Sequence, residues 1–178
     1  DAESRERDAA DLVVGTSAGS VIGAYLRNGW TPHDFWEAVH NRHPNQDAIG
    51  GPDHKSFLPA YASPFDFLRR GLGSAYVAGR SVLRLPTPPL PSLLQRAFPG
   101  GLFSIGEVRE RLFAELPETW PVASLWLCTV NLGNGRRVVL GRKGSPAVPL
   151  ATGVLASCAI PGVYSPVRAG GLTLVDGG

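Results

Sequence analysis

A short glycine-flanked turn near the N-terminus constrains the fold of this chain more than any other feature. An apolar run at residues 12–14 leads into the pentapeptide of residues 15–19, which is followed by a segment rich in small residues. This order predicts a strand, a sharp bend and a helix, with Ser17 at the tip of the bend. Such a turn is a nucleophile elbow, although the same residues also suit a tight turn without chemistry.

The residues around Ser17 have separate expected roles. We expect a side chain at either Gly15 or Gly19 to clash, because the strand and the helix must approach closely there. The N–H of Ala18 lies at the expected helix N-terminus, where unpaired donors and the positive end of the helix dipole can stabilise an oxyanion.

Composition favours a globular α/β domain and excludes several classes. The 178 residues fit one domain, 43% of them hydrophobic and 18% charged, with a net charge of only +2. No basic stripe suggests a nucleic-acid partner, and no run approaches the ~20 apolar residues of a membrane-spanning helix. Cys128 and Cys158 lie in apolar runs, so we expect reduced, buried thiols.

The two ends of the sequence suggest a chain truncated at both termini. There is no methionine, residue 1 is an aspartate in a charged segment, and the chain stops directly after an expected strand. A targeting signal at the N-terminus would then be lost. A cytoplasmic or peripherally membrane-associated location is the expectation.

Hydrophobic periodicity and turn residues divide the rest of the chain into helices and strands. Expected strands lie at residues 12–14, 125–131, 136–140 and 172–175, with a hairpin turn at Asn134-Gly135. Expected helices lie at 18–28, from a cap at Thr31 to before Pro44, behind a capping box at 104–107, and at 148–159. Residues 45–64 and 82–101 are expected surface loops. The alternation predicts layered α/β architecture with a mostly parallel sheet.

Several aromatic side chains lie between and around these loops. They either fill the core or line an acyl-chain groove beside Ser17. These residues are Phe57, Tyr61, Phe65, Phe67, Tyr76, Phe98 and Phe103.

A serine nucleophile needs a base, and the histidines are poorly placed to supply one. All four lie within 37 residues after Ser17, whereas the usual serine, acid, histidine order puts the base last. They are His33, His40, His43 and His54. A metal site formed by His40, His43 and Asp47 is not expected, because histidines on helix surfaces are usually solvated.

One carboxylate has a suitable position. Asp11 precedes its strand and would lie roughly 15–20 Å from Ser17 at ~3.3 Å per residue. Asp34, Asp47, Asp53 and Asp66 lie in helix or loop with no feature aiming them inward. Asp176 follows a strand, and in a parallel arrangement it emerges at the sheet edge that carries the elbow. The alternative for Asp176 is an ordinary Asp-Gly turn.

Together these motifs make the chain resemble the patatin-like phospholipases. That family has a Gly-x-Ser-x-Gly elbow followed far downstream by Asp-Gly-Gly or Asp-Gly-Ala, present here at residues 15–19 and as Asp176-Gly177-Gly178. Residues 128–135 and 156–167 also resemble the family. The resemblance covers the chain from residue 11 to the end.

The resemblance implies a three-layer α/β domain with a mostly parallel central sheet flanked by helices, partial over residues 1–178. It implies a serine lipid acyl hydrolase with Ser17 as nucleophile and Asp176 as proton acceptor, acting through an acyl-enzyme without metal or cofactor. Lipid or acyl-ester substrates and a peripheral membrane surface are the implied partners. The rest of the oxyanion hole would lie in a glycine-rich loop missing upstream, so this fragment alone is expected to be impaired.

Two alternatives stay open from the sequence. One is a catalytically inactive patatin-like module that binds a lipid surface or a partner. The other is a Ser-His-Asp esterase whose histidine lies beyond Gly178.

Overall fold

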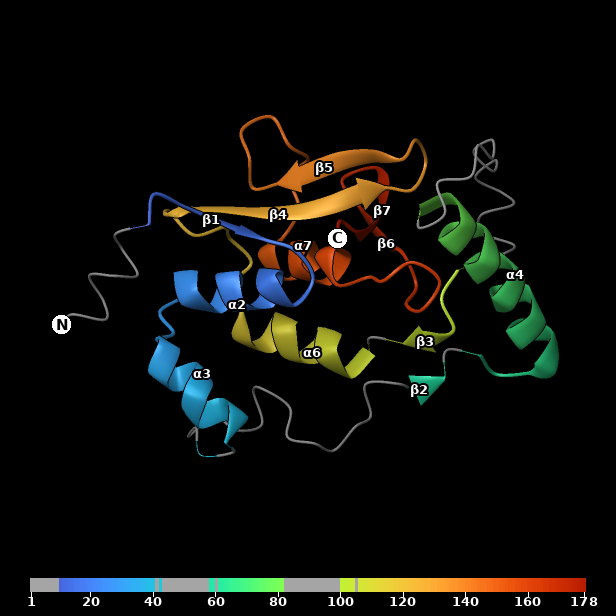
Figure 1. Ribbon diagram of the computed structural model, residues 1–178, viewed down its shortest axis with the longest axis horizontal. Helices are drawn as coiled ribbons and strands as arrows, with labels where there is room; N and C mark the ends of the chain where they lie inside the picture. Colours follow the sequence, from blue (N-terminus) through green and yellow to red (C-terminus); the bar gives the residue numbers. More distant parts are fainter. Residues whose placement is uncertain (1–9, 41, 43–57, 60, 82–99, 105) are drawn as a thin grey trace.

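The computed structural model describes residues 10–40, 42, 58–59, 61–81, 100–104 and 106–178. Its elements follow one another along the chain (Figure 1) as β1 (Leu12–Gly15), α2 (Ala18–Arg27), α3 (Pro32–Val39), β2 (Leu58–Pro59), α4 (Pro64–Ser81), β3 (Phe103–Ser104), α6 (Gly106–Glu115), β4 (Ser124–Asn131), β5 (Arg136–Leu140), α7 (Leu150–Ser157), β6 (Val167–Ala169) and β7 (Leu172–Asp176).

A mixed sheet of five strands organises the described chain. β1 and β7 pair with successive parts of one edge of β4, β6 pairs with β7, and β5 pairs with the opposite edge of β4. Only β1 and β4 run parallel, whereas β4–β5, β4–β7 and β6–β7 are antiparallel. The expectation of a mostly parallel sheet is therefore wrong for the described strands. The physical reason is that β4–β5 and β6–β7 are joined by short hairpins, which permit only antiparallel pairing.

Helices α2 and α7 cover one face of this sheet and form the main core with it. Figure 1 shows α6 on their far side, away from the strands. Leu127, Leu140, Leu150, Val154 and Leu174 are completely buried in this core. Because α7 is apolar all round, it is buried between the sheet and the other helices.

The opposite face of the sheet is covered at one end by α4. Val175 follows Leu174 in β7, so the two side chains point to opposite faces. Whereas Leu174 belongs to the main core, Val175 packs in a second cluster with Val77 of α4 and with Leu132. At this end the sheet therefore has helices on both faces.

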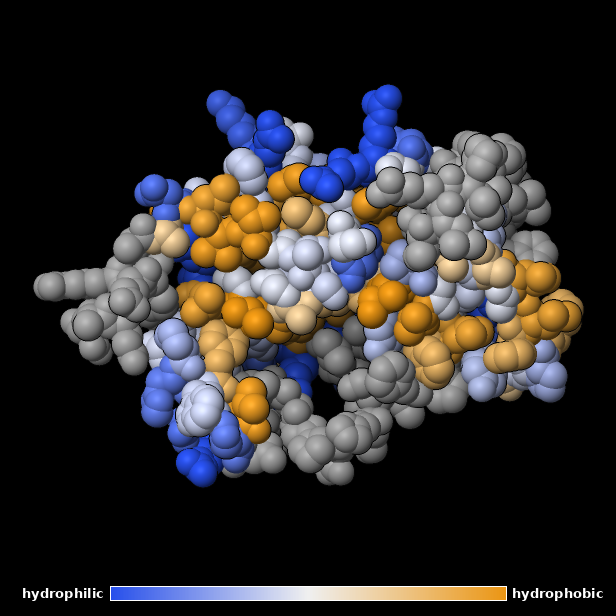
Figure 2. Space-filling model, in the orientation of Figure 1, coloured by the Kyte–Doolittle hydropathy of each residue, from blue (hydrophilic) through white to orange (hydrophobic). Residues whose placement is uncertain are grey.

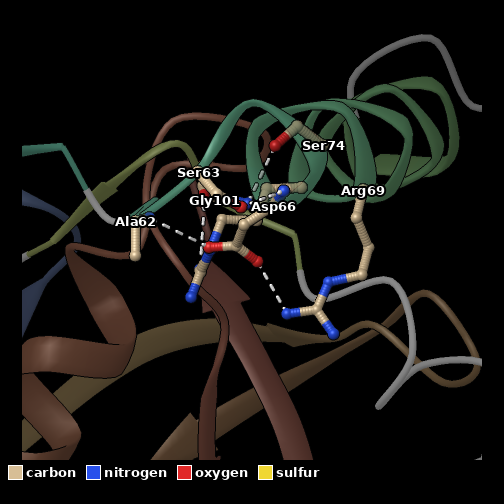
Figure 3. Close-up of polar contacts among 7 residues, drawn as sticks. Ala62, Ser63, Asp66, Arg69, Ser74 and Gly101 are labelled. Carbon is tan, nitrogen blue, oxygen red and sulfur yellow. Dashed lines mark hydrogen bonds and ion pairs between the residues drawn. The ribbon is translucent and has the colours of Figure 1, made fainter.

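Polar contacts in α4 stabilise its first turns and join the helix to another segment (Figure 3). The Asp66 carboxylate pairs with Arg69 at 2.6 Å and with Arg70 at 3.0 Å, and these contacts lower the pKa of Asp66. The buried hydroxyl of Ser74 accepts a hydrogen bond from the N–H of Gly101 at 2.8 Å. The hydrogen bond between Ser74 and Gly101 joins α4 to the segment that leads into β3.

Most elements expected from the sequence are confirmed. The strands at 12–14, 125–131, 136–140 and 172–175 and the helices at 18–28 and 148–159 agree to within two residues. The cap at Thr31 is also confirmed, since its side chain accepts from the N–H of Asp34 in a capping box, and α3 then ends at Val39.

Some elements of the structure were not predicted, and some predicted features lie outside the described residues. The sequence did not predict α4, β6 or the two-residue strands β2 and β3. The helix expected behind residues 104–107 is confirmed as α6. The side chains of its expected capping box lie outside the described residues. Most of the two expected loops and the aromatics Phe57 and Phe98 also lie outside them. Cys128 and Cys158 are free thiols, as expected, and half-buried rather than buried. In the described residues, no helix is long and apolar enough to cross a membrane.

Tyr25 of α2 links its helix to α6 and predicts a pH dependence of stability. Its hydroxyl donates to Glu115, and burial first, then this bond and the charge of Glu115, raise the pKa of Tyr25. Because the folded chain holds the proton more tightly, the stabilisation is complete below the unfolded pKa of about 10 and is lost as pH rises above it.

We therefore expect the free energy of unfolding to fall by about 1 kcal/mol more in the wild type than in Tyr25→Phe between pH 9.5 and 11. Urea titrations at several pH values measure this difference. Tyr61→Phe, at a position 38% exposed, is the control and should follow the wild type. Parallel loss of stability in wild type and Tyr25→Phe would contradict the prediction.

Candidate active site

The elbow has the backbone geometry that the sequence predicts. β1 ends at Gly15 and α2 begins at Ala18, so two residues make the whole turn. Ser17 has φ 50° and ψ −127°, and among the described residues it is the only one other than glycine with a positive φ. A residue with a Cβ adopts this conformation only when its surroundings enforce it.

The two elbow glycines differ in what they permit. A Cβ on Gly15 would lie 2.5 Å from the carbonyl oxygen of Gly19 and 2.7 Å from the Cα of Ser20, so β1 and α2 touch there backbone to backbone. A Cβ on Gly19 would meet nothing within 4 Å. The expectation that a side chain would clash at either place is therefore right for Gly15 and wrong for Gly19, where a Cβ would point into open space.

The end of β7 meets the end of β1 along one edge of β4. Gly15 pairs with Leu127 of β4, and Asp176 pairs with Thr129. Because β5 pairs with both of these β4 residues, β1 and β7 must share the other edge. One runs parallel to β4 and one antiparallel, so their C-terminal ends point toward each other across Cys128.

The direction of β7 differs from the direction that the sequence prediction for Asp176 assumed. The aspartate was expected at the elbow because of a parallel strand, whereas it arrives there on an antiparallel strand from the opposite direction. Residues 127 and 129 lie on the same face of β4, so Gly15 and Asp176 face the same helices.

The Asp176 carboxylate is held beside the elbow. Its Oδ1 accepts hydrogen bonds from the Thr16 hydroxyl at 3.3 Å and from the N–H of Gly178 at 2.9 Å. A Cβ on Gly177 would lie 2.6 Å from the carbonyl carbon of Cys128, so only glycine lets the chain pass over β4 there. Ser17 and Asp176 themselves are not hydrogen-bonded, and the contact between their segments runs through Thr16.

Three polar groups on these neighbouring segments have no hydrogen-bond partner in the described part of the chain. No described residue forms a hydrogen bond with Oγ of Ser17, with the N–H of Ala18 or with Oδ2 of Asp176. Ala18 is exposed at the N-terminus of α2, where the helix dipole favours negative charge. The arrangement combines a hydroxyl, a carboxylate oxygen and a backbone donor that are all available to a ligand.

The C-terminal end of α7 supports both sides of this site. The N–H of Ser17 donates to Ser157, and the N–H of Asp176 donates to the carbonyl of Ala159 at 2.9 Å. The thiol of Cys158 donates to the carbonyl of Ser17 at 3.3 Å. Burial raises the pKa of the Cys158 thiol, and the charge of Asp176 adds to this rise, against a lowering contribution from its contact with Ser20.

The described histidines lie away from Ser17. His33 lies in α3 and His40 caps its end, with its ring against Trp36. Helix α2, whose ten residues span about 15 Å, runs from the elbow to the turn that precedes α3. His43, His54 and Asp47 lie outside the described residues, and no cluster that could hold a metal occurs among the described ones.

Comparison with known proteins agrees with the motifs at both ends. A family model described as Patatin-like phospholipase matches residues 3–178. No curated protein matches the chain. The resemblance seen in the elbow and the Asp-Gly-Gly motif is thereby confirmed over nearly the whole chain.

The two elbow glycines give a matched pair of stability predictions. Gly15→Ala forces a Cβ into backbone atoms that cannot yield cheaply, so we expect a loss of about 1–3 kcal/mol or more in unfolding free energy. Gly19→Ala places its methyl in open space on a helix, and its stability should stay within about 1 kcal/mol of the wild type or rise. Chemical denaturation measures both. Equal losses in the two variants would contradict the elbow geometry.

Proposed function

The chain belongs to the patatin-like phospholipase family, a family of lipid hydrolases with a three-layer α/β domain, and we propose that it cleaves lipid acyl esters with Ser17 and Asp176 as a dyad. The observation that carries the proposal is the Asp176 carboxylate, which lies 3.3 Å from the hydroxyl of Thr16, the residue next to Ser17. Oδ2 of this carboxylate is open toward a further donor.

In the first half of the proposed reaction, Ser17 Oγ attacks the ester carbonyl carbon and its proton passes to Asp176. The tetrahedral oxyanion accepts a hydrogen bond from the N–H of Ala18, aided by the dipole of α2. The bond to the leaving alcohol then breaks, and the alcohol oxygen takes the proton from Asp176. An acyl ester of Ser17 remains.

In the second half, water attacks the acyl carbon and gives a proton to Asp176. The bond to Ser17 Oγ breaks, the proton returns to that oxygen, and a carboxylic acid leaves. The dyad is thus regenerated with no net change in protons. No metal or cofactor is needed for these steps.

The dyad predicts that two substitutions remove activity in the full-length gene product. Ser17→Ala and Asp176→Asn should each lower kcat on a short-chain p-nitrophenyl ester by about 10³-fold or more, since one removes the nucleophile and the other its base. Ser74→Ala and Asp66→Asn, which change the same residue types on α4, are matched controls and should retain activity. Thermal denaturation checks that all four variants fold.

Fluorophosphonate labelling separates the alternatives. Stoichiometric labelling of Ser17 that is lost in Asp176→Asn supports the dyad, because labelling requires an activated hydroxyl. Labelling that survives in Asp176→Asn points to another base, such as a histidine outside this chain. An unlabelled, inactive wild type would indicate a binding module without turnover. Full turnover in either dyad variant would refute the dyad.

We further propose that α4 contacts the lipid surface in which the substrate resides. Apolar side chains are exposed along α4, and Figure 2 shows them on the right of the molecule. Phe65 is 76% exposed, Leu68 59% and Leu72 54%, at a spacing that puts them on one helical face. The sequence predicts that Phe65 fills the core or lines a groove, whereas in the structure its side chain lies at the surface.

This surface predicts binding to neutral vesicles. The triple variant Phe65→Ser, Leu68→Ser, Leu72→Ser should bind phosphatidylcholine vesicles at least about tenfold more weakly, because apolar contact area is lost. Its kcat on a water-soluble ester should not change. Val122→Ser, at a fully exposed position away from α4, is the control in a flotation assay. Undiminished vesicle binding by the triple variant would exclude α4 as the contact.

A further inference from the structure

Ser157, the last residue of α7, forms an unusual set of contacts with the elbow. The side chain is completely buried. Its Oγ donates to the carbonyl of Cys128 at 2.8 Å and accepts from the N–H of Ser17 at 3.1 Å. The backbone carbonyl of Ser157 accepts from the same N–H, also at 3.1 Å. One residue thus holds the elbow and the central strand together.

The two atoms that Ser157 contacts are those that fix the geometry of the site. Ser17 has the strained φ of 50°. Because its carbonyl is held on the other side of the N–Cα bond, a change in φ would rotate the peptide plane whose N–H is bound by Ser157. Cys128 pairs with Val139 of β5, but on the other edge of β4 it falls in the gap between the ends of β1 and β7. The hydrogen bonds from Ser17 to Ser157 and from Ser157 to Cys128 therefore fix the position of the elbow relative to the end of β7, which carries Asp176.

Other bonds to the elbow restrain different atoms. The carbonyl of Ser17 accepts from the Ser20 hydroxyl at 2.6 Å and from the Cys158 thiol. The N–H of Ser17 is bound only by Ser157 among the described residues. Removing the Ser157 hydroxyl leaves the backbone bond in place, so the elbow should loosen without the fold being lost.

We propose that Ser157 is a positioning residue that holds Ser17 in its strained conformation and at a fixed distance from Asp176. The role of Ser157 in turnover rests on the proposed function of the dyad. Its role in holding the elbow does not, because the hydrogen bonds exist whatever the chemistry.

Hydrogen exchange tests the elbow contact independently of activity. In the wild-type full-length protein, the amide of Ser17 should exchange more slowly than that of Ala18, which has no acceptor among the described residues. In Ser157→Ala, exchange at Ser17 should become faster. Equal exchange at Ser17 and Ala18 in the wild type, or unchanged exchange in Ser157→Ala, would overturn the proposal.

Kinetics test the consequence for the reaction. Ser157→Ala should lower kcat on a p-nitrophenyl ester by about 10- to 100-fold, because small misplacement of a reacting group is costly. It should slow fluorophosphonate labelling of Ser17 by a similar factor and leave KM within about twofold. Faster amide exchange with unchanged kcat and labelling would overturn the positioning role.

Ser74→Ala is the matched control. Ser74 is also a buried serine whose Oγ accepts from a backbone N–H, that of Gly101, but it lies on α4 (Figure 3). It should lose a comparable amount of thermal stability and keep its kcat. An equal loss of kcat in Ser74→Ala would show that a general loss of stability, and not positioning, explains Ser157→Ala. Full activity in Ser17→Ala would refute the proposed dyad. The exchange data would still test whether Ser157 holds the N–H of Ser17.

Discussion

The meeting of two strand ends on one edge of β4 is the constraint on which the rest of the site depends. β1 and β7 run toward each other and stop at Leu127 and Thr129, with one residue of β4 between their partners. Because side chains alternate between faces, a slip of one residue in either ladder would turn its terminal residue away from the helices. The sheet hydrogen bonds therefore bring together residues that are separated by almost the whole chain.

Helix α7 converts this meeting of strands into a defined site. It is buried over nearly its whole length, so its C-terminal residues have little freedom to move. From that fixed end, Ser157 binds the N–H of Ser17 and Ala159 binds the N–H of Asp176. A strained residue such as Ser17 costs of order 1–3 kcal/mol, and contacts with a rigid element offset that cost.

The sequence predicted the parts of this site that depend on local chemistry. Gly15 could be recognised because an elbow requires a close backbone contact between strand and helix. The sequence alone does not tell that Gly19 joins this contact through its carbonyl while its own Cβ position is open. The direction of β7 could not be predicted, because strand polarity depends on the pairing partner and not on the apolar pattern of the strand itself. Asp176 was placed at the elbow by an incorrect route, and β4 supplies the correct one.

The missed elements have physical reasons of the same kind. β6 has only three residues, too few for an alternating pattern. Pro64 belongs to an expected loop, although proline suits the first turn of a helix and Ser63 accepts from the N–H of Asp66 as an N-terminal cap does. Exposed apolar residues hid the periodicity of α4. A search for Ser-Pro-x-Asp followed by a long stretch without further proline would have found the helix.

The distribution of hydrogen bonds separates the groups that hold the backbone of the site from the groups proposed to react. Ser157, Ser20 and Thr16 all have protein partners, and their polar groups fix the backbone or the carboxylate. Oγ of Ser17 and Oδ2 of Asp176 have none in the described chain. Ser17 and Asp176 are partly exposed and Ala18 is exposed, so solvent can complete these groups and a ligand can replace that solvent, as the proposed reaction requires.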